Sequence, residues 1–337
     1  MADVTHIEWT DATWNPITGC SIVSPGCTNC YAMRLAGTRL KYIPSRNGLT
    51  VDSKAGPVWN GEVRLNEQWL DQPLRWKRPR RIFVCAHGDL FAENVPDEWI
   101  DKVFAVMALA PQHTFQVLTK RAARMRQYIN SNETRLRVLG DGVADAFDAA
   151  GIPWNGNWGD RHSQAIASAT IWPLPNVWLG VSAEDQTRAD ERVPELLATP
   201  AAIRFVSAEP LLAPIQFDDF CNGHKFIDAL RGNWWHDDPD GPNPISRGHE
   251  KIDWIIVGGE SGPGARPMHP DWARSIRDQC AGARTAFFFK QWGAYLPGGQ
   301  MMADGRLWSS AGGNNLHASK TLAGRFLDGA EHNAMPS

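Results

Sequence analysis

Trp254-Ile255-Ile256-Val257 is a near-continuous apolar run, and the polar stretch Gly258-Gly259-Glu260-Ser261 follows it directly. A short run of this kind, rich in β-branched residues, is typical of a strand buried on both faces of a parallel sheet. We also expect a first strand near Ile7–Trp9. Five further runs share the same character, and each ends in polar or glycine-rich residues: Ile82–Cys85, Thr114–Leu118, Val177–Val181, Ile203–Val206 and Thr285–Phe289.

Helical patterns lie between several of these runs. One opens at Pro96, with acidic residues in its first turn, and continues to Met107. A second covers about Ala189 to Leu197, and a third starts near Pro270. Alternation of strands and helices predicts right-handed βαβ units. The sequence therefore predicts an α/β fold: a partial or complete parallel (β/α) barrel of six to seven strands.

Two segments interrupt this alternation and predict loop insertions. Residues 130–175 and 218–250 are rich in Gly, Asp, Asn, Pro and Trp. Insertions on the loops of a barrel often carry specificity. We expect residues 1–295 to form the barrel domain with these two insertions, and residues 296–337 to form a C-terminal extension.

The composition and net charge of the chain exclude several classes of protein. The chain has 337 residues, 43% hydrophobic residues and a net charge of −3, so any contact with nucleic acid must rest on a local basic patch. The N-terminus lacks the pattern of a signal peptide, and no apolar run approaches the ~20 residues of a membrane helix. We expect a cytoplasmic protein without a membrane partner. In that compartment the crowding of three of the six cysteines favours a metal site over disulfides.

These three cysteines are Cys20, Cys27 and Cys30, with the spacing C-x6-C-x2-C. Thiolates are soft ligands that suit iron–sulfur clusters or zinc. A structural site normally has four protein ligands. Three thiolates would leave one iron of a [4Fe–4S] cluster open to a small chelating ligand, such as S-adenosylmethionine (SAM).

A zinc site is the alternative interpretation of the same three cysteines. Cys221 and His224, with His236 and His249 beyond them, offer a distant fourth ligand. The spacing of the cysteines by itself does not separate zinc from an iron–sulfur cluster.

The cysteine stretch resembles the three-Cys loop of radical SAM enzymes, in which an aromatic residue, here Tyr31, often follows the last cysteine. The family commonly has C-x3-C-x2-C, and this chain has six residues in the first gap. More narrowly, the chain resembles a phage-associated three-Cys-motif family. The shared stretches are Trp14–Tyr31, Ser207–Pro210, Gly258–Gly262 and Phe289–Gly293.

The resemblance implies a radical SAM enzyme. Its three cysteines would hold a [4Fe–4S] cluster, and the reduced cluster would cleave SAM to give a 5′-deoxyadenosyl radical. An electron donor such as flavodoxin or ferredoxin is implied as a partner. If the chain is phage-encoded, its compartment is the host cytoplasm.

The resemblance also suggests roles for polar residues at strand ends, where barrels carry their active sites. Asp89 is the candidate for the methionine amino group of SAM, and Ser182 and Glu184 are candidates for the ribose. The alternative for Asp89 and Glu184 is helix capping. The remaining cofactor-binding candidates are Tyr31, which follows the last cysteine, Glu209 and Glu260, which end strands, and Gly258 and Gly259, where the backbone would approach adenine or carboxylate.

The prediction of the substrate rests on weaker sequence signals. The basic stretch Arg75–Arg81, the cations Lys120, Arg121 and Arg124, and sixteen tryptophans suit nucleic acid, although a solvated charged face explains the same residues. Phage members of the resembled family occur beside DNA-modifying enzymes. We therefore expect an isomerase that rearranges an amino-acid-decorated thymidine in DNA or a nucleotide, in a hypermodification that protects the phage genome from host restriction.

Three alternatives stay open. A radical SAM enzyme of the same construction would act on RNA, a peptide or a small metabolite. Another would reverse damage in pyrimidines. A protein of a different class would use zinc for stability and bind nucleic acid without catalysis.

Overall fold

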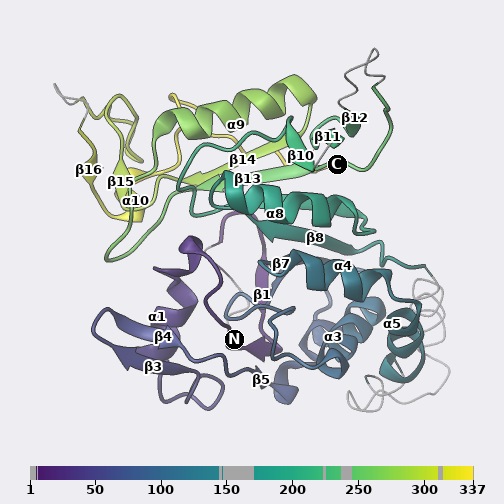
Figure 1. Ribbon diagram of the computed structural model, residues 1–337. Helices are drawn as coiled ribbons and strands as arrows, with labels where there is room; N and C mark the ends of the chain where they lie inside the picture. The colour runs from purple at the N-terminus through teal and green to yellow at the C-terminus, as the bar shows by residue number, and fades with distance from the viewer. Residues whose placement is uncertain are drawn as a thin grey trace. The chain divides into compact units, whose positions relative to one another are not determined.

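The main feature of the computed structural model is a seven-stranded sheet, drawn in Figure 1, with the order β1-β6-β7-β8-β9-β13-β14. The structure describes residues 5, 7–143, 146, 171–222, 225–236, 245–309 and 314–336. The order begins with β1 and ends with β14, as in a partial parallel barrel, which confirms the predicted α/β fold class. The strands are β1 (Ala12–Trp14), β6 (Arg81–Val84), β7 (Thr114–Thr119), β8 (Val177–Ser182), β9 (Ile203–Ala208), β13 (Trp254–Gly258) and β14 (Ala286–Gln291).

The apolar runs of the sequence explain why these segments form the sheet. β13 is buried at every position, and it pairs in parallel with β9 on one side and β14 on the other. β6 pairs in parallel with β1 and β7. All six apolar runs identified in the sequence coincide with strands of this sheet, and only the end residues Cys85 and Thr285 lie just outside them.

The prediction of a first strand near Ile7–Trp9 is wrong. Trp9 lies in a turn, and the first strand begins at Ala12. The Trp9 side chain is nonetheless buried, with its ring 4.8 Å from that of Phe83. Its apolar character therefore reflects the packing of one side chain in a turn and not a strand.

The three predicted helices are confirmed as α3 (Asp97–Leu109), α8 (Gln186–Leu197) and α9 (Pro270–Ala283). α8 starts earlier than predicted because the Asp185 side chain accepts a hydrogen bond from the backbone N–H of Arg188, which caps the helix. Two more helices, α4 (Ala122–Asn130) and α5 (Asn132–Arg137), follow β7. In the part of the chain that the structure describes, every helix is too short or too polar to span a membrane.

The chain clusters into two compact units that do not follow chain order. The first unit contains Met1–Val23, Cys30–Gly180 and Thr199–Ala202, and the second contains Ser24–Asn29, Val181–Ala198 and Ile203–Ser337. The cysteine stretch is thus shared, since Cys20 and Cys30 belong to the first unit and Cys27 to the second.

Several short elements are inserted between β1 and β6, in the first unit. They are β2 (Ile17–Thr18), η1 (Pro25–Cys27, which clusters with the second unit), α1 (Tyr31–Gly37), β3 (Thr50–Ser53), β4 (Gly56–Trp59), β5 (Arg64–Leu65), η2 (Glu67–Trp69) and α2 (Gln72–Arg75).

The structure describes the two predicted insertions to different extents. The segment near 130–175 contains α5 and the π-helical turn η3 (Val138–Gly142), and residues 144–145 and 147–170 lie outside the described part. The segment near 218–250 contains a three-stranded antiparallel sheet of β10 (Phe220–Asn222), β11 (Lys225–Asp228) and β12 (Asn233–His236). Residues 223–224 and 237–244 lie outside the described part.

The C-terminal segment returns to the sheet after β15 (Tyr295–Leu296), β16 (Leu316–His317) and α10 (Lys320–Ala323). The backbone N–H of Phe289 in β14 donates to the carbonyl of His332 over 2.9 Å. The Ala334 N–H donates to Phe287, and the Trp254 indole donates to the Ala334 carbonyl over 2.9 Å. The last residues therefore cover the edge of β14, which would otherwise present unpaired backbone groups.

Deleting residues 331–337 should destabilise the protein by about 3 kcal/mol, because three hydrogen bonds worth about 1 kcal/mol each are lost. Urea denaturation followed by tryptophan fluorescence measures this change. Deleting only residues 335–337 leaves all three bonds in place and serves as the control. Equal unfolding midpoints for the two truncated chains would show that the segment does not support the sheet.

Candidate functional site

The cysteine loop begins at the carboxyl end of the first strand. The N–H of Cys85, just past β6, donates to the Trp14 carbonyl over 2.7 Å, and Gly19 and Gly88 form a parallel bridge beyond the two strands. Gly19 has φ of +97°, and a Cβ there would lie 2.1 Å from the Glu62 carbonyl oxygen. Glycine is therefore required immediately before Cys20.

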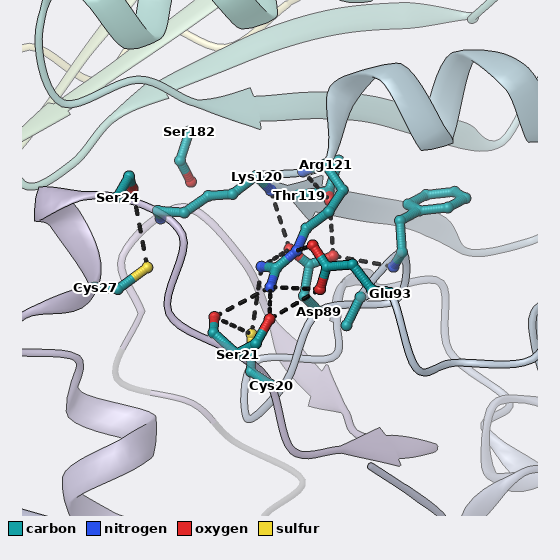
Figure 2. Close-up of polar contacts among 12 residues, drawn as sticks. Cys20, Ser21, Ser24, Cys27, Asp89, Glu93, Thr119, Lys120, Arg121 and Ser182 are labelled. Carbon is teal, nitrogen blue, oxygen red and sulfur yellow. Dashed lines mark hydrogen bonds and ion pairs between the residues drawn. The ribbon is translucent and has the colours of Figure 1, made fainter. Parts of the chain in front are cut away.

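Cys20 contacts a buried cation. Nη1 of Arg121 donates to the Cys20 Sγ over 3.4 Å, and Nη2 donates to the Ser21 carbonyl over 3.1 Å, as Figure 2 shows. Arg121 is the second residue after the end of β7, and its side chain is only 6% exposed. The end of one strand thus supplies a hydrogen-bond donor to the first cysteine of the motif.

Two carboxylates hold Arg121 in place. Its Nη1 lies 3.2 Å from Asp89 Oδ2, and its Nε lies 3.0 Å from Glu93 Oε1. Burial lowers the pKa of Arg121. The charges of Asp89, Glu93 and Cys20 raise this pKa by more than burial lowers it, so the guanidinium stays protonated. Burial raises the pKa of Glu93, yet hydrogen bonds from Arg121 and Ser21 and the Arg121 charge lower it to about 2.

Asp89 is saturated with donors. Its Oδ1 accepts from the Thr119 hydroxyl over 2.7 Å and from the Phe91 N–H, and its Oδ2 accepts from the Lys120 N–H and from Arg121. A carboxylate has about four lone-pair positions, and here each is used. Asp89 therefore fixes the loop after β7 and caps no helix. Its predicted role toward SAM stays a prediction, and that role would require one of these bonds to open.

The middle of the cysteine loop is held by residues of the second unit. The Gly26 N–H donates to Glu184 Oε1 over 3.0 Å, and Asn29 Nδ2 donates to Glu260 Oε2 over 3.0 Å. Arg266 Nη2 donates to the Pro25 carbonyl over 3.0 Å. These three contacts join the segment around Cys27 to the ends of β8 and β13.

Glu184 is fully buried beside its own cation. Arg192 Nη1 lies 3.1 Å from Glu184 Oε2, and it also donates to the Ser182 carbonyl over 2.7 Å. Asp185, and not Glu184, caps α8, so the capping alternative for Glu184 is wrong. Glu184 and Ser182 stay predictions as ribose ligands, but the structure places the Glu184 carboxylate on the backbone of the cysteine loop.

Glu260 has a similar arrangement. Arg266 donates to both of its carboxylate oxygens, over 2.7 and 2.9 Å, and its own N–H donates as well. Burial raises the pKa of Glu260, but the hydrogen bonds from Arg266 and Asn29 lower it below its usual range. Neither Arg266 nor Arg192 was singled out from the sequence, because a surface arginine gives the same pattern.

Glu209 and the two glycines lie together near the ends of β9 and β13. Glu209 Oε1 lies 2.8 Å from Lys290 Nζ. A Cβ at Gly258 would lie 2.6 Å from Glu209 Oε1, and one at Gly259 would lie 2.0 Å from the Trp292 carbonyl. The backbone packing therefore requires Gly259, whereas a shift of the Glu209 side chain would make room at Gly258. The approach of either glycine to a cofactor stays a prediction.

The other two cysteines have apolar or hydroxyl neighbours. Cys27 is buried, with its Sγ 3.9 Å from the Ser24 hydroxyl (Figure 2). Cys30 packs with Cys20 against a single apolar cluster in the first unit that includes Met33 and Trp59. Tyr31, half exposed, donates its hydroxyl to the Ala86 carbonyl.

No disulfide joins any of the six cysteines, all of which lie in the described part of the chain. Among the residues that the structure describes, no three His, Cys, Asp or Glu side chains converge as the ligands of one metal ion do. In a cluster each thiolate binds a different iron, so its thiolates stand further apart than the ligands of a single ion. His224, from the zinc alternative, lies outside the described residues.

The basic residues occupy different places. The stretch Arg75–Arg81 leads into the amino end of β6, the opposite end from the cysteine loop, and Arg80 stacks on Trp76 at 4.8 Å. Arg124 donates to the carbonyls of Ala92 and Val95. Lys120 follows β7 directly, and its ammonium forms no hydrogen bond or ion pair with the described residues.

Residues 4–336 match the family model described as a protein of unknown function, DUF5131, so the chain belongs to this family. No curated protein and no solved structure matches it.

Replacing Arg266 with Ala should loosen the middle of the cysteine loop, because the bond to Pro25 and the cation beside Glu260 are lost together. We expect the amide hydrogens of Gly26, Cys27 and Thr28 to exchange about tenfold faster, which corresponds to a loss of about 1.4 kcal/mol. Hydrogen exchange read by mass spectrometry measures the change.

Arg306→Ala is the control, since it removes an arginine that is 70% exposed and whose side chain, among the described residues, pairs only with the neighbouring carboxylate of Asp304. Unchanged exchange in residues 24–29 of the Arg266 variant would mean that this contact does not hold the loop.

Proposed function

We propose that this protein is a radical SAM enzyme that holds a [4Fe–4S] cluster through Cys20, Cys27 and Cys30. One observation carries the proposal: three cysteines, none of them in a disulfide, occur within eleven residues, in a loop that starts at the carboxyl end of the first strand of a parallel sheet. Active sites of parallel barrels lie at this end of the strands.

The donor set fits the cluster. Three thiolates are soft ligands, and their number leaves one iron for a chelating cosubstrate. When bound, a reduced [4Fe–4S] cluster supplies the electron that cleaves SAM and so produces the radical that takes hydrogen from the substrate.

The chain's own residues position this loop. Arg121 donates to the Cys20 sulfur, while Glu184 accepts from Gly26 and Arg266 donates to Pro25. Residues before Cys27 are thereby held by buried or half-buried charged groups, and Asn29, after Cys27, donates to the buried Glu260, which restricts the loop before any ligand arrives.

Lys120 is the group best suited to an anion on the cosubstrate or the substrate. Its ammonium has no partner among the described residues, and the adjacent Arg121 is already committed to Asp89 and Glu93. An anion would therefore bind to Lys120 without breaking an ion pair among the described residues. The Asp89 and Glu184 carboxylates are mainly engaged in holding the chain.

We propose an amino-acid-decorated thymidine in DNA or a nucleotide as the substrate, which the enzyme would isomerise during hypermodification. The support is the resemblance of the cysteine loop and the strand-end motifs to the phage-associated family. The basic stretch Arg75–Arg81, with Trp76 beneath Arg80, offers a second place for a DNA backbone.

The first test reconstitutes the protein with iron and sulfide under anaerobic conditions, reduces it and adds SAM. We expect about four irons per chain and 5′-deoxyadenosine, detected by mass spectrometry. Replacing Cys20, Cys27 and Cys30 together with Ala should abolish both. Cys221→Ala is the matched control, because this cysteine is exposed and outside the loop, and it should leave both unchanged.

Stoichiometric zinc with no iron uptake and no 5′-deoxyadenosine would overturn the proposal in favour of a zinc-stabilised protein. Loss of zinc on Cys221→Ala would then assign Cys221 as the fourth ligand.

The second test concerns the substrate. DNA carrying amino-acid-decorated thymidine should yield a nucleoside of unchanged mass and altered chromatographic retention, because an isomerisation conserves every atom. Unmodified DNA, RNA and irradiated DNA are the comparison substrates. Turnover of irradiated DNA alone would identify a repair enzyme, and turnover of RNA alone would also overturn the thymidine assignment.

A further inference from the structure

The contact between Arg121 and Cys20 differs from the other contacts of the cysteine loop, because it reaches a sulfur atom. The Arg266 and Glu184 contacts end on backbone groups, whereas Nη1 of Arg121 donates to Sγ of Cys20. Hydrogen bonds to cysteine sulfur are one of the means by which a protein adjusts the potential of an iron–sulfur cluster.

The orientation of the guanidinium is over-determined. Nε and Nη2 donate to Glu93 over 3.0 and 3.1 Å, Nη2 also donates to Ser21, and Nη1 is shared between Asp89 and Cys20. Arginine has five N–H donors in a rigid fork, and the two ends of this fork are fixed on different partners. The donor therefore cannot turn away from the sulfur without breaking several other bonds.

The surroundings make this a local hydrogen bond and not a general positive field. Asp89 is held by Thr119 and by backbone N–H groups, and Glu93 accepts from the Ser21 hydroxyl over 2.8 Å. These two carboxylates more than offset the single charge of Arg121. Cys20 therefore receives a directed hydrogen bond, with Nη1 of Arg121 3.4 Å from its Sγ. The Arg121 side chain is only 6% exposed.

We propose that Arg121 is a positioning residue that raises the reduction potential of the cluster bound through Cys20. The inference rests on the proposed function. An N–H donor withdraws charge from the thiolate sulfur, and this stabilises the reduced cluster, which carries one more electron. Arg121 would thereby hold the cluster within reach of its electron donor.

The test compares midpoint potentials of the reconstituted full chain without SAM, from a redox titration followed by electron paramagnetic resonance. Arg121→Gln should lower the potential by an amount equivalent to about tenfold in the oxidised-to-reduced ratio, or ~59 mV for one electron. Arg121→Lys keeps a cation between Asp89 and Glu93, so it protects the fold, and its potential should fall between those of the other two proteins.

Arg124→Gln is the matched control. It makes the same change of charge within the first turn of α4, and Arg124 donates to carbonyls and to Asp97 instead of sulfur. Its potential should equal that of the wild type. Iron content is measured in each protein, so a change of potential at equal iron content separates tuning from loss of the cluster.

Equal potentials in the wild type and both Arg121 variants would overturn the inference and leave the proposed function standing. Failure of the wild type to assemble any cluster would overturn the proposed function, and the inference with it. Loss of iron from both Arg121 variants would show that Arg121 is needed to build the site and does not tune it, which also overturns the inference.

Discussion

A parallel sheet brings the carboxyl end of every strand to the same edge, and the polar side chains of this protein depend on that constraint. In the first unit the residues after β1, β6 and β7 meet, so Cys20, Asp89 and Arg121 form one hydrogen-bonded group. In the second unit the residues after β8 and β13 reach the segment around Cys27. Without parallel pairing, residues so distant in sequence would have no reason to converge.

The free-energy cost of burying a charged side chain then determines how these groups are paired. Glu184 and Arg192 are almost completely buried, and each supplies what the other requires. Asp89 and Arg121 form a second buried pair, and the buried Glu260 pairs with Arg266, which is 35% exposed. A buried charge without a partner is costly, so the chain pairs each carboxylate first and uses the remaining lone pairs on backbone N–H groups of the loop. Several carboxylates that end strands are thereby structural supports of the cysteine loop.

The sequence was informative where a single signal dominates. Continuous apolar runs identified all the strands of the main sheet except β1, because a strand buried on both faces leaves little choice of residue. β1 was missed because it has only three residues and the buried Trp9 lies just before it in a turn. For the site, spacing located the three cysteines and the strand-end carboxylates. It did not assign their partners, because the partners of Glu184 and Glu260 depend on tertiary contacts that no local pattern records.

The sequence separation of the loop contacts has a consequence for biosynthesis. Gly26 and its acceptor Glu184 are 158 residues apart, and Asn29 and Glu260 are 231 residues apart. The ribosome exposes the cysteines early, when none of these acceptors has yet been translated. The loop thus gains the last of its supports, Glu260 and Arg266, only after residue 266 emerges, and closing such long chain segments slows folding. Until then the segment around Cys27 lacks its contacts with Glu260 and Arg266, so any ligand that needs this segment in its final arrangement can bind only after residue 266 has emerged.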